Sequence, residues 1–170
     1  MSMGEALVVA TIWVALACYP AGPWGRVFRS GDRTDRSRPL RLIWTLGCAA
    51  FLAHVAASFH VFYDWSHGVA LSETARQVEE LFGVRSGSGL YLNYLFTLVW
   101  LVDAIAWWRW PGWPGNRARW ALLAIHGFFL FMIFNATVVF EQGATRLFGA
   151  AVTVAGLWGL VAAVRSRSAS

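Results

Sequence analysis

The sequence of 170 residues contains no lysine and few charged residues of any kind. Charged side chains make up 14% of the chain, against roughly one quarter in soluble domains, whereas apolar residues make up 58%. The net charge of +5 comes from arginine alone. This composition excludes an ordinary soluble domain and predicts one integral membrane domain that includes the whole chain.

Cysteines and catalytic motifs are scarce as well. The two cysteines, Cys18 and Cys48, lie in apolar segments and do not have a metal-binding spacing. The sequence contains no HExxH, no phosphate-binding or dinucleotide-binding glycine pattern, and no repeated ExxH of the di-iron bundles. These absences favour a protein that is not an enzyme, although they do not decide the question.

Five apolar segments are each close to the ~20 residues that a helix needs to cross the hydrocarbon of a bilayer. They cover residues 4–20, 40–63, 90–109, 119–140 and 146–164. In the segment 69–83, Leu71, Ala75, Val78 and Phe82 fall on one face of a helix. We therefore predict an all-α membrane protein, a bundle of about five transmembrane helices with one external amphipathic helix.

The amphipathic segment carries signals for its own start and end. Ser72 or Thr74 is the expected N-cap, and Gly83 is the expected end. Arg76 and Glu80 are spaced to pair at i, i+4. This helix is expected to lie along the outer membrane surface, or to cover the outer ends of the spans as a lid.

The arginines predict the orientation of the chain in the membrane. The loop after the first span and the positions facing the same side hold eleven of them: Arg26, Arg29, Arg33, Arg36, Arg38, Arg41, Arg109, Arg117, Arg119, Arg165 and Arg167. The positive-inside rule then places the N-terminus outside and the C-terminus in the cytoplasm of a bacterial-type inner (plasma) membrane. Because topology explains these arginines, we expect no nucleic-acid partner. The expected partners are the lipid bilayer and either a subunit of a membrane complex or further copies of the chain.

Five tryptophans flank the arginine-bearing loop between the third and fourth spans. They are Trp107, Trp108, Trp110, Trp113 and Trp120. Tryptophan is enriched at membrane interfaces, so these residues predict an interfacial aromatic belt, with a quinone or lipid pocket as the alternative.

A candidate metal site follows from His60, Asp64 and His67, which form one stripe if residues 60–67 are helical. Glu141 is the fourth expected ligand. The expected supporting residues are Tyr63, Tyr91, Asn93 and Asn135. Histidine with carboxylate is a common ligand set for zinc, copper or iron. The alternative is an interfacial patch in which these side chains bond to water and to each other.

Ionisable residues inside the spans suggest two further hypotheses. Asp103 and His126 both fall ~6 Å to the inner side of their span centres, as a polar pair between neighbouring helices or a proton relay requires. His54 and His126 are the histidine pair that remains for haem b, although their depths differ by ~10 Å.

We therefore expect an outward-facing metal or haem site with a redox or metal-handling role. One alternative is a non-catalytic accessory or assembly subunit of a membrane complex. Another is a small transporter or a proton relay through Asp103 and His126. Metal binding requires the outer side chains to converge, whereas an accessory subunit predicts that they diverge. Transport predicts a polar path that joins them to Asp103 and His126.

Overall fold

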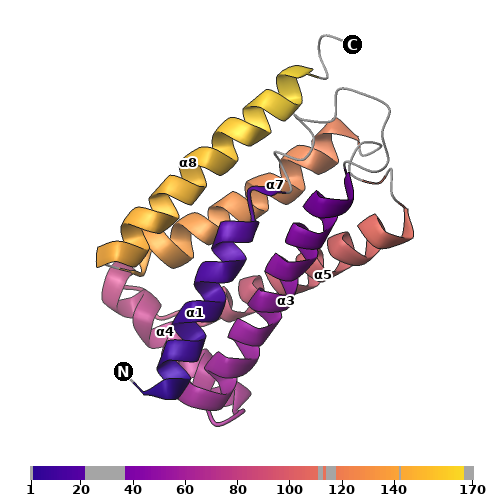
Figure 1. The fold of residues 1–170 in the computed structure, drawn as a ribbon. Coiled ribbons are helices and arrows are strands. Elements are labelled where there is room, and N and C mark those ends of the chain that lie inside the picture. Colours follow the sequence, from indigo (N-terminus) through magenta and orange to yellow (C-terminus); the bar gives the residue numbers. More distant parts are fainter. Residues whose placement is uncertain (1, 22–36, 111–112, 114–117, 142, 167–170) are drawn as a thin grey trace.

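The computed structural model describes residues 2–21, 37–110, 113, 118–141 and 143–166. Every element in these ranges is helical. The elements are α1 (Met3–Cys18), α3 (Ser37–Phe62), α4 (His67–Phe82), α5 (Ser88–Arg109), α7 (Arg119–Phe134), the π-helical η2 (Asn135–Val139) and α8 (Gly143–Ser166). The long helices form a bundle, and α4 lies across one end of it (Figure 1). The predicted all-α membrane bundle with an additional amphipathic helix is confirmed.

Four of these helices are long and apolar enough to cross a membrane, namely α3, α5, α7 together with η2, and α8. The apolar helix α1, with 16 residues, is shorter. The helices start and end within three residues of the predicted ranges. The protein is therefore a multi-pass membrane protein in which a shorter first helix packs beside α3 (Figure 1).

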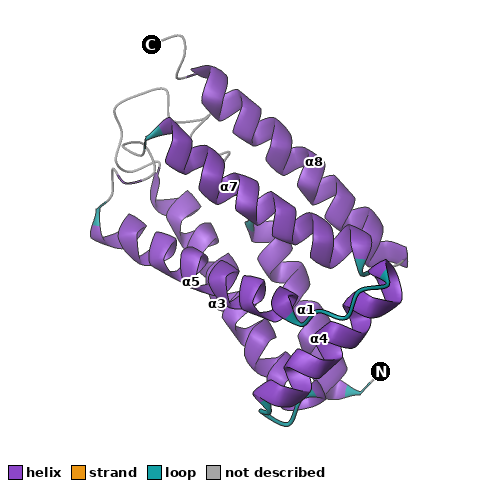
Figure 2. Ribbon diagram, turned by 180° about the vertical axis from the view of Figure 1, so that it is seen from behind, coloured by secondary structure: helices purple, strands orange, loops and turns teal. Residues whose placement is uncertain are grey.

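The bundle has two ends that differ in charge. The N-terminus and α4 lie at one end, which we call the α4 end (Figure 1). The C-terminal end of α8 lies at the other, which carries Arg38, Arg41, Arg109 and Arg165 and which we call the arginine end. The helices α7 and α8 run side by side between the two ends in both views (Figure 1, Figure 2).

The core is a cluster of aromatic side chains contributed by four helices. Tyr19 follows α1, and Trp44, Trp100 and Phe129 come from α3, α5 and α7; each is at most 2% exposed. The ring centroids of Trp44 and Trp100 lie 5.2 Å apart, and those of Trp100 and Phe129 lie 5.3 Å apart. Aromatic rings prefer edge-to-face and tilted contacts. The cluster therefore also restricts the rotation of each helix about its own axis.

A close approach of three helices occurs at Gly47 of α3. A Cβ atom at this position would lie 2.8 Å from Cys18 Cβ of α1 and 2.9 Å from Trp100 Cζ2 of α5. The absence of a side chain therefore allows α3 to pack against both neighbours, as small residues do in membrane helix contacts.

The chain reverses sharply between α3 and α4. The helix α3 ends at Phe62, and Asp64 and Trp65 adopt left-handed backbone conformations with φ of 47° and 59°. Ser66 then caps α4, because its Oγ accepts a hydrogen bond from Val69 N at 3.3 Å. The prediction of a cap at Ser72 or Thr74 was wrong. These hydroxyls instead donate to carbonyl groups of the preceding turn.

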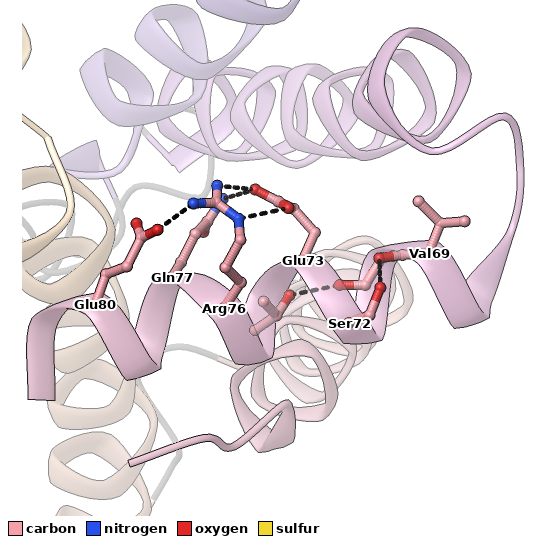
Figure 3. Close-up of polar contacts among 8 residues, drawn as sticks. Val69, Ser72, Glu73, Arg76, Gln77 and Glu80 are labelled. Carbon is pink, nitrogen blue, oxygen red and sulfur yellow. Dashed lines mark hydrogen bonds and ion pairs between the residues drawn. The ribbon is translucent and has the colours of Figure 1, made fainter. Parts of the chain in front are cut away.

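The rest of α4 follows the sequence pattern. Gly83, with φ of 71°, ends the helix, and its N–H donates to Glu79 O at 2.8 Å. Arg76 pairs with Glu80 as predicted and also donates from Nε to Glu73 at 3.0 Å (Figure 3). The exposed face of α4 is therefore stabilised by ion pairs along the helix.

Candidate functional site

The structure does not keep His60, Asp64 and His67 on one helix. The predicted stripe was wrong because α3 ends at Phe62, which leaves His60 on α3, Asp64 in the turn and His67 at the start of α4. All three side chains are exposed. His67 Nδ1 shares a hydrogen bond with the Tyr94 hydroxyl at 2.9 Å, so that this histidine joins α4 to α5.

The other residues predicted around this site have separate environments. Glu141 is exposed, and so is Asn93. Asn135 donates from Nδ2 to the carbonyl of Phe131 in its own helix at 2.8 Å. In the described part of the chain, no three residues of the types His, Cys, Asp and Glu are arranged to hold a metal ion. Metal or haem binding at this end stays a prediction.

Two tyrosines of the predicted site, Tyr63 and Tyr91, contact other aromatic rings at the α4 end. Tyr63 is half-buried, and burial together with the nearby carboxylate of Glu73 raises the pKa of its hydroxyl. The ring of Tyr91 lies 5.9 Å from that of His67. Such contacts fit the interfacial patch that was the alternative for these residues.

The two deep histidines lie in different surroundings. His54 donates from Nδ1 to Val8 O at 3.0 Å, which connects α3 to α1. His126 is buried, with its ring centroid 6.0 Å from Trp44 and 6.2 Å from Tyr19. In the structure His54 contacts a neighbouring helix, and His126 lies in the aromatic core. Their role as a haem pair stays a hypothesis.

Asp103 is the one acidic side chain of α5, and it is buried. Trp113 donates from Nε1 to Asp103 Oδ1 at 3.1 Å. Trp113 was predicted as part of the interfacial belt, and sequence reasoning missed this contact because the residue lies outside any periodic segment. Asp103 and His126 are both buried, as a pair of membrane residues would be, and their proposed relay stays a prediction.

A cavity between α1, α3, α5, α7 and η2 is the most site-like feature. Its enclosed volume is about 40 Å³, and the space grows to about 390 Å³ when the open side is counted. Apolar atoms dominate its lining, which includes the rings of Tyr19, Phe51, Phe96 and Trp100 and the polar side chains of Asn93 and Thr137. The enclosed part is smaller than the ~300–1,000 Å³ that is usual for small-molecule sites, so that a ligand would also occupy the open side.

In the described part of the chain, Trp13, Trp44, Trp100 and Trp107 each have a buried, unpaired indole N–H, and Trp100 is the one of the four that lines the cavity. Its Nε1 is buried and has no hydrogen-bond partner among the residues that the structure describes. Leaving such a donor unpaired costs about 1–3 kcal/mol. Two other polar groups of the lining already have hydrogen-bond partners. Thr137 Oγ1 donates to Ile133 O at 2.7 Å, and the Tyr19 hydroxyl donates to His126 O at 3.4 Å.

The π-helical segment η2 forms one wall of the cavity. It begins at Asn135, whose carbonyl accepts from Phe140 N at 3.1 Å, and it contributes Ala136 and Thr137 to the lining. Single π turns inside α-helices are frequent at functional sites. The sequence does not predict this cavity, because a π turn has no simple residue pattern and the cavity forms only when five elements pack.

No family model, curated protein or solved structure matches this chain. The function is therefore inferred from the geometry of the candidate site and not from likeness to another protein.

Proposed function

We propose that this protein binds a flat, ring-bearing apolar molecule that carries a hydrogen-bond acceptor, a class that includes the quinones. The observation that carries this proposal is the aromatic cavity whose lining includes Trp100, a residue with an unpaired indole N–H. A ring compound gains stacking contacts with Phe96 and Trp100, and its acceptor satisfies the buried donor.

The bilayer is the natural source of such a ligand. Ala136 both lines the cavity and is exposed on the surface of the bundle, so this wall reaches the outside of the protein. An apolar molecule dissolved in the membrane meets this surface without crossing water. A lipid-soluble ligand of this kind retains the redox role expected from the sequence without requiring a metal.

We also propose a location and an orientation for the protein. The protein lies in a bacterial-type inner membrane with its N-terminus outside and its C-terminus in the cytoplasm. The distribution of arginine supports this orientation, since Arg38, Arg41, Arg109 and Arg165 gather at the arginine end. At the α4 end, by contrast, Arg76 and Arg85 are ion-paired with glutamates.

The experiment is equilibrium binding of a short-chain benzoquinone to the detergent-purified full chain. Trp100→Phe keeps an aromatic ring and removes the donor, so we expect about tenfold weaker binding. Trp120→Phe is the matched control, because Trp120 is 75% exposed and lies outside the cavity lining. Equal affinity of the wild type and Trp100→Phe would contradict the role of the indole.

A second pair of variants tests the cavity itself. Ala136→Leu places a larger side chain in the lining and should abolish binding, whereas Ala124→Leu, on the exposed face of α7, should not. Mass spectrometry of organic extracts from both preparations then shows whether a natural ring compound is lost with the cavity. Failure of the wild type to bind any ring compound would refute the proposal.

The second candidate function is that of a non-catalytic accessory subunit. The divergence of His60, Asp64 and His67 onto different elements favours it, because this is what a structural role of these residues predicts. Gentle detergent extraction followed by native mass spectrometry tests it. A stoichiometric partner protein is the expected result, and a chain that stays alone in every extraction argues against this function.

A further inference from the structure

At the arginine end, α3 and α5 meet through contacts among Trp108, Thr45 and Arg41. Trp108 of α5 donates from Nε1 to Thr45 Oγ1 of α3 at 2.9 Å. Thr45 in turn donates to Arg41 O at 2.8 Å. The Arg41 guanidinium lies over the Trp108 ring, with its carbon atom 4.1 Å from the ring centroid. The cation is therefore held in place by stacking rather than left free to rotate.

Among the residues that the structure describes, no acidic side chain forms an ion pair with the arginines of this region. Arg41 Nε is buried without a hydrogen-bond partner in the described part of the chain. The ion pairs formed between described residues all involve Arg76 or Arg85 at the α4 end. Arg38, one turn before Arg41, and Arg109, next to Trp108, add two further exposed cations. The chemistry that fits these groups is an anion with several acceptor oxygens.

Exposed apolar side chains continue from this charged region along the same helices. Leu42 and Leu46 of α3 are 50% and 56% exposed, and Ile105 of α5 is 59% exposed. They lie on the turns next to Arg41, Thr45 and Trp108. A ligand with a phosphate at one end and hydrocarbon at the other matches both parts, whereas a free anion matches only the first.

We propose that Arg41, stacked on Trp108 and supported by Arg38 and Arg109, binds the phosphate of an anionic glycerophospholipid, whose acyl chains lie along Leu42, Leu46 and Ile105. This site lies at the arginine end and does not depend on the cavity, so it stands even if the proposed function fails. Arginine binds phosphate through two parallel N–H donors, which lysine cannot supply in the same geometry.

Native mass spectrometry of the full chain in detergent, with added phosphatidylglycerol or phosphatidylcholine, tests the site. We expect the wild type to prefer phosphatidylglycerol and Arg41→Gln to bind it about tenfold more weakly. The matched control Arg146→Gln makes the same charge change at an exposed position near the α4 end and should bind like the wild type.

The double variant Arg38→Gln with Arg109→Gln keeps the stacked Arg41 and should also lose affinity, which provides a test if Arg41→Gln fails to fold. Inorganic phosphate is the competing anion in a parallel series. Displacement of the lipid by equimolar phosphate would identify a free-anion site and overturn the assignment to lipid. Equal binding of both lipids, or equal binding by all variants, would overturn the site itself.

Discussion

His54 shows how a polar side chain is accommodated inside this bundle. Its Nδ1 donates to Val8 O of the neighbouring helix at 3.0 Å, and Thr11 Oγ1 also donates to this carbonyl at 3.0 Å. A histidine in a lipid-facing bundle is costly unless its polar atoms find partners. The hydrogen bond thus offsets the cost of burying the imidazole, and it connects α1 to α3.

Replacement of His54 by leucine should therefore weaken the packing of α1 on α3. Because one interhelical hydrogen bond is lost, we expect the free energy of unfolding to fall by about 1 kcal/mol. Chemical unfolding in detergent micelles measures this change. His60→Leu is the matched control on the same helix, since His60 is exposed, and an equal loss in both variants would contradict the interpretation.

At the scale of single residues, the depth of the ionisable side chains in the bundle could be predicted, but their hydrogen-bond partners could not. The span positions of Asp103 and His126 predicted two buried ionisable groups, and both are buried. One donor to Asp103 is Trp113, which lies ten positions away in the sequence and outside any helical repeat. Partners of this kind depend on how the chain returns to the bundle, which residue types and spacing do not determine.

Helix α8 packs on η2 through a glycine. A Cβ atom at Gly149 would overlap the Thr137 side chain, so that the two helices approach more closely than any larger residue permits. Thr137 is buried and donates to Ile133 O at 2.7 Å. This contact holds the π-helical wall of the cavity against α8.

Gly149→Ala should consequently destabilise the bundle, by about 1–3 kcal/mol for an overpacked contact. Gly127→Ala is the control, because no atom lies within 4 Å of the added Cβ and alanine favours the helix. Thermal unfolding of both variants measures the difference. The addition of Thr137→Gly to Gly149→Ala should recover part of the loss, and no recovery would show that the overlap is not the cause.

Helix α4 is expected to lose stability in acid. Hydrogen bonds from Arg76 lower the pKa of the Glu73 carboxyl below its usual value of 4.5. A carboxyl with a lowered folded pKa stabilises the folded state above the unfolded pKa and loses this contribution as the pH falls through the folded value. The effect is small because the side chains of Arg76 and Glu73 are 51% and 33% exposed, so that solvent screens the pair.

Arg76→Gln is the variant that tests this dependence. The unfolding midpoint of the wild type should drop more between pH 7 and about pH 3.5 than that of Arg76→Gln, because the variant lacks the cation that lowers the Glu73 pKa. Arg146→Gln is the control and should drop as the wild type does. Equal drops in all three proteins would mean that the Glu73 and Arg76 pair does not contribute.

At the scale of elements, the sequence predicted helices well and their breaks less well. Apolar runs of bilayer length set the bounds of α3, α5 and α8 within three residues. The turn that separates His60 from His67 was missed because Asp64 and Trp65 take left-handed conformations that glycine or asparagine usually signals. The π turn η2 was missed for the same kind of reason, since no residue in Asn135–Val139 marks it.

For the whole molecule, the predicted orientation can be tested by thiol labelling, because the native cysteines are buried. Cys18 and Cys48 are both free and buried, so they provide a low background for thiol labelling. Ser72 lies exposed on α4 and Arg38 lies exposed at the opposite, arginine end. A cysteine at either position therefore reports one face of the membrane.

We expect a membrane-impermeant maleimide to label Ser72→Cys in intact cells, and Arg38→Cys only after the cells are opened. The reason is that arginines beside membrane spans are retained on the cytoplasmic side. The unsubstituted chain is the control and should stay unlabelled in both conditions. Labelling of Arg38→Cys alone in intact cells would invert the orientation and place α4 in the cytoplasm. Both proposed binding sites would keep their geometry, but the phosphate site would then face the other leaflet.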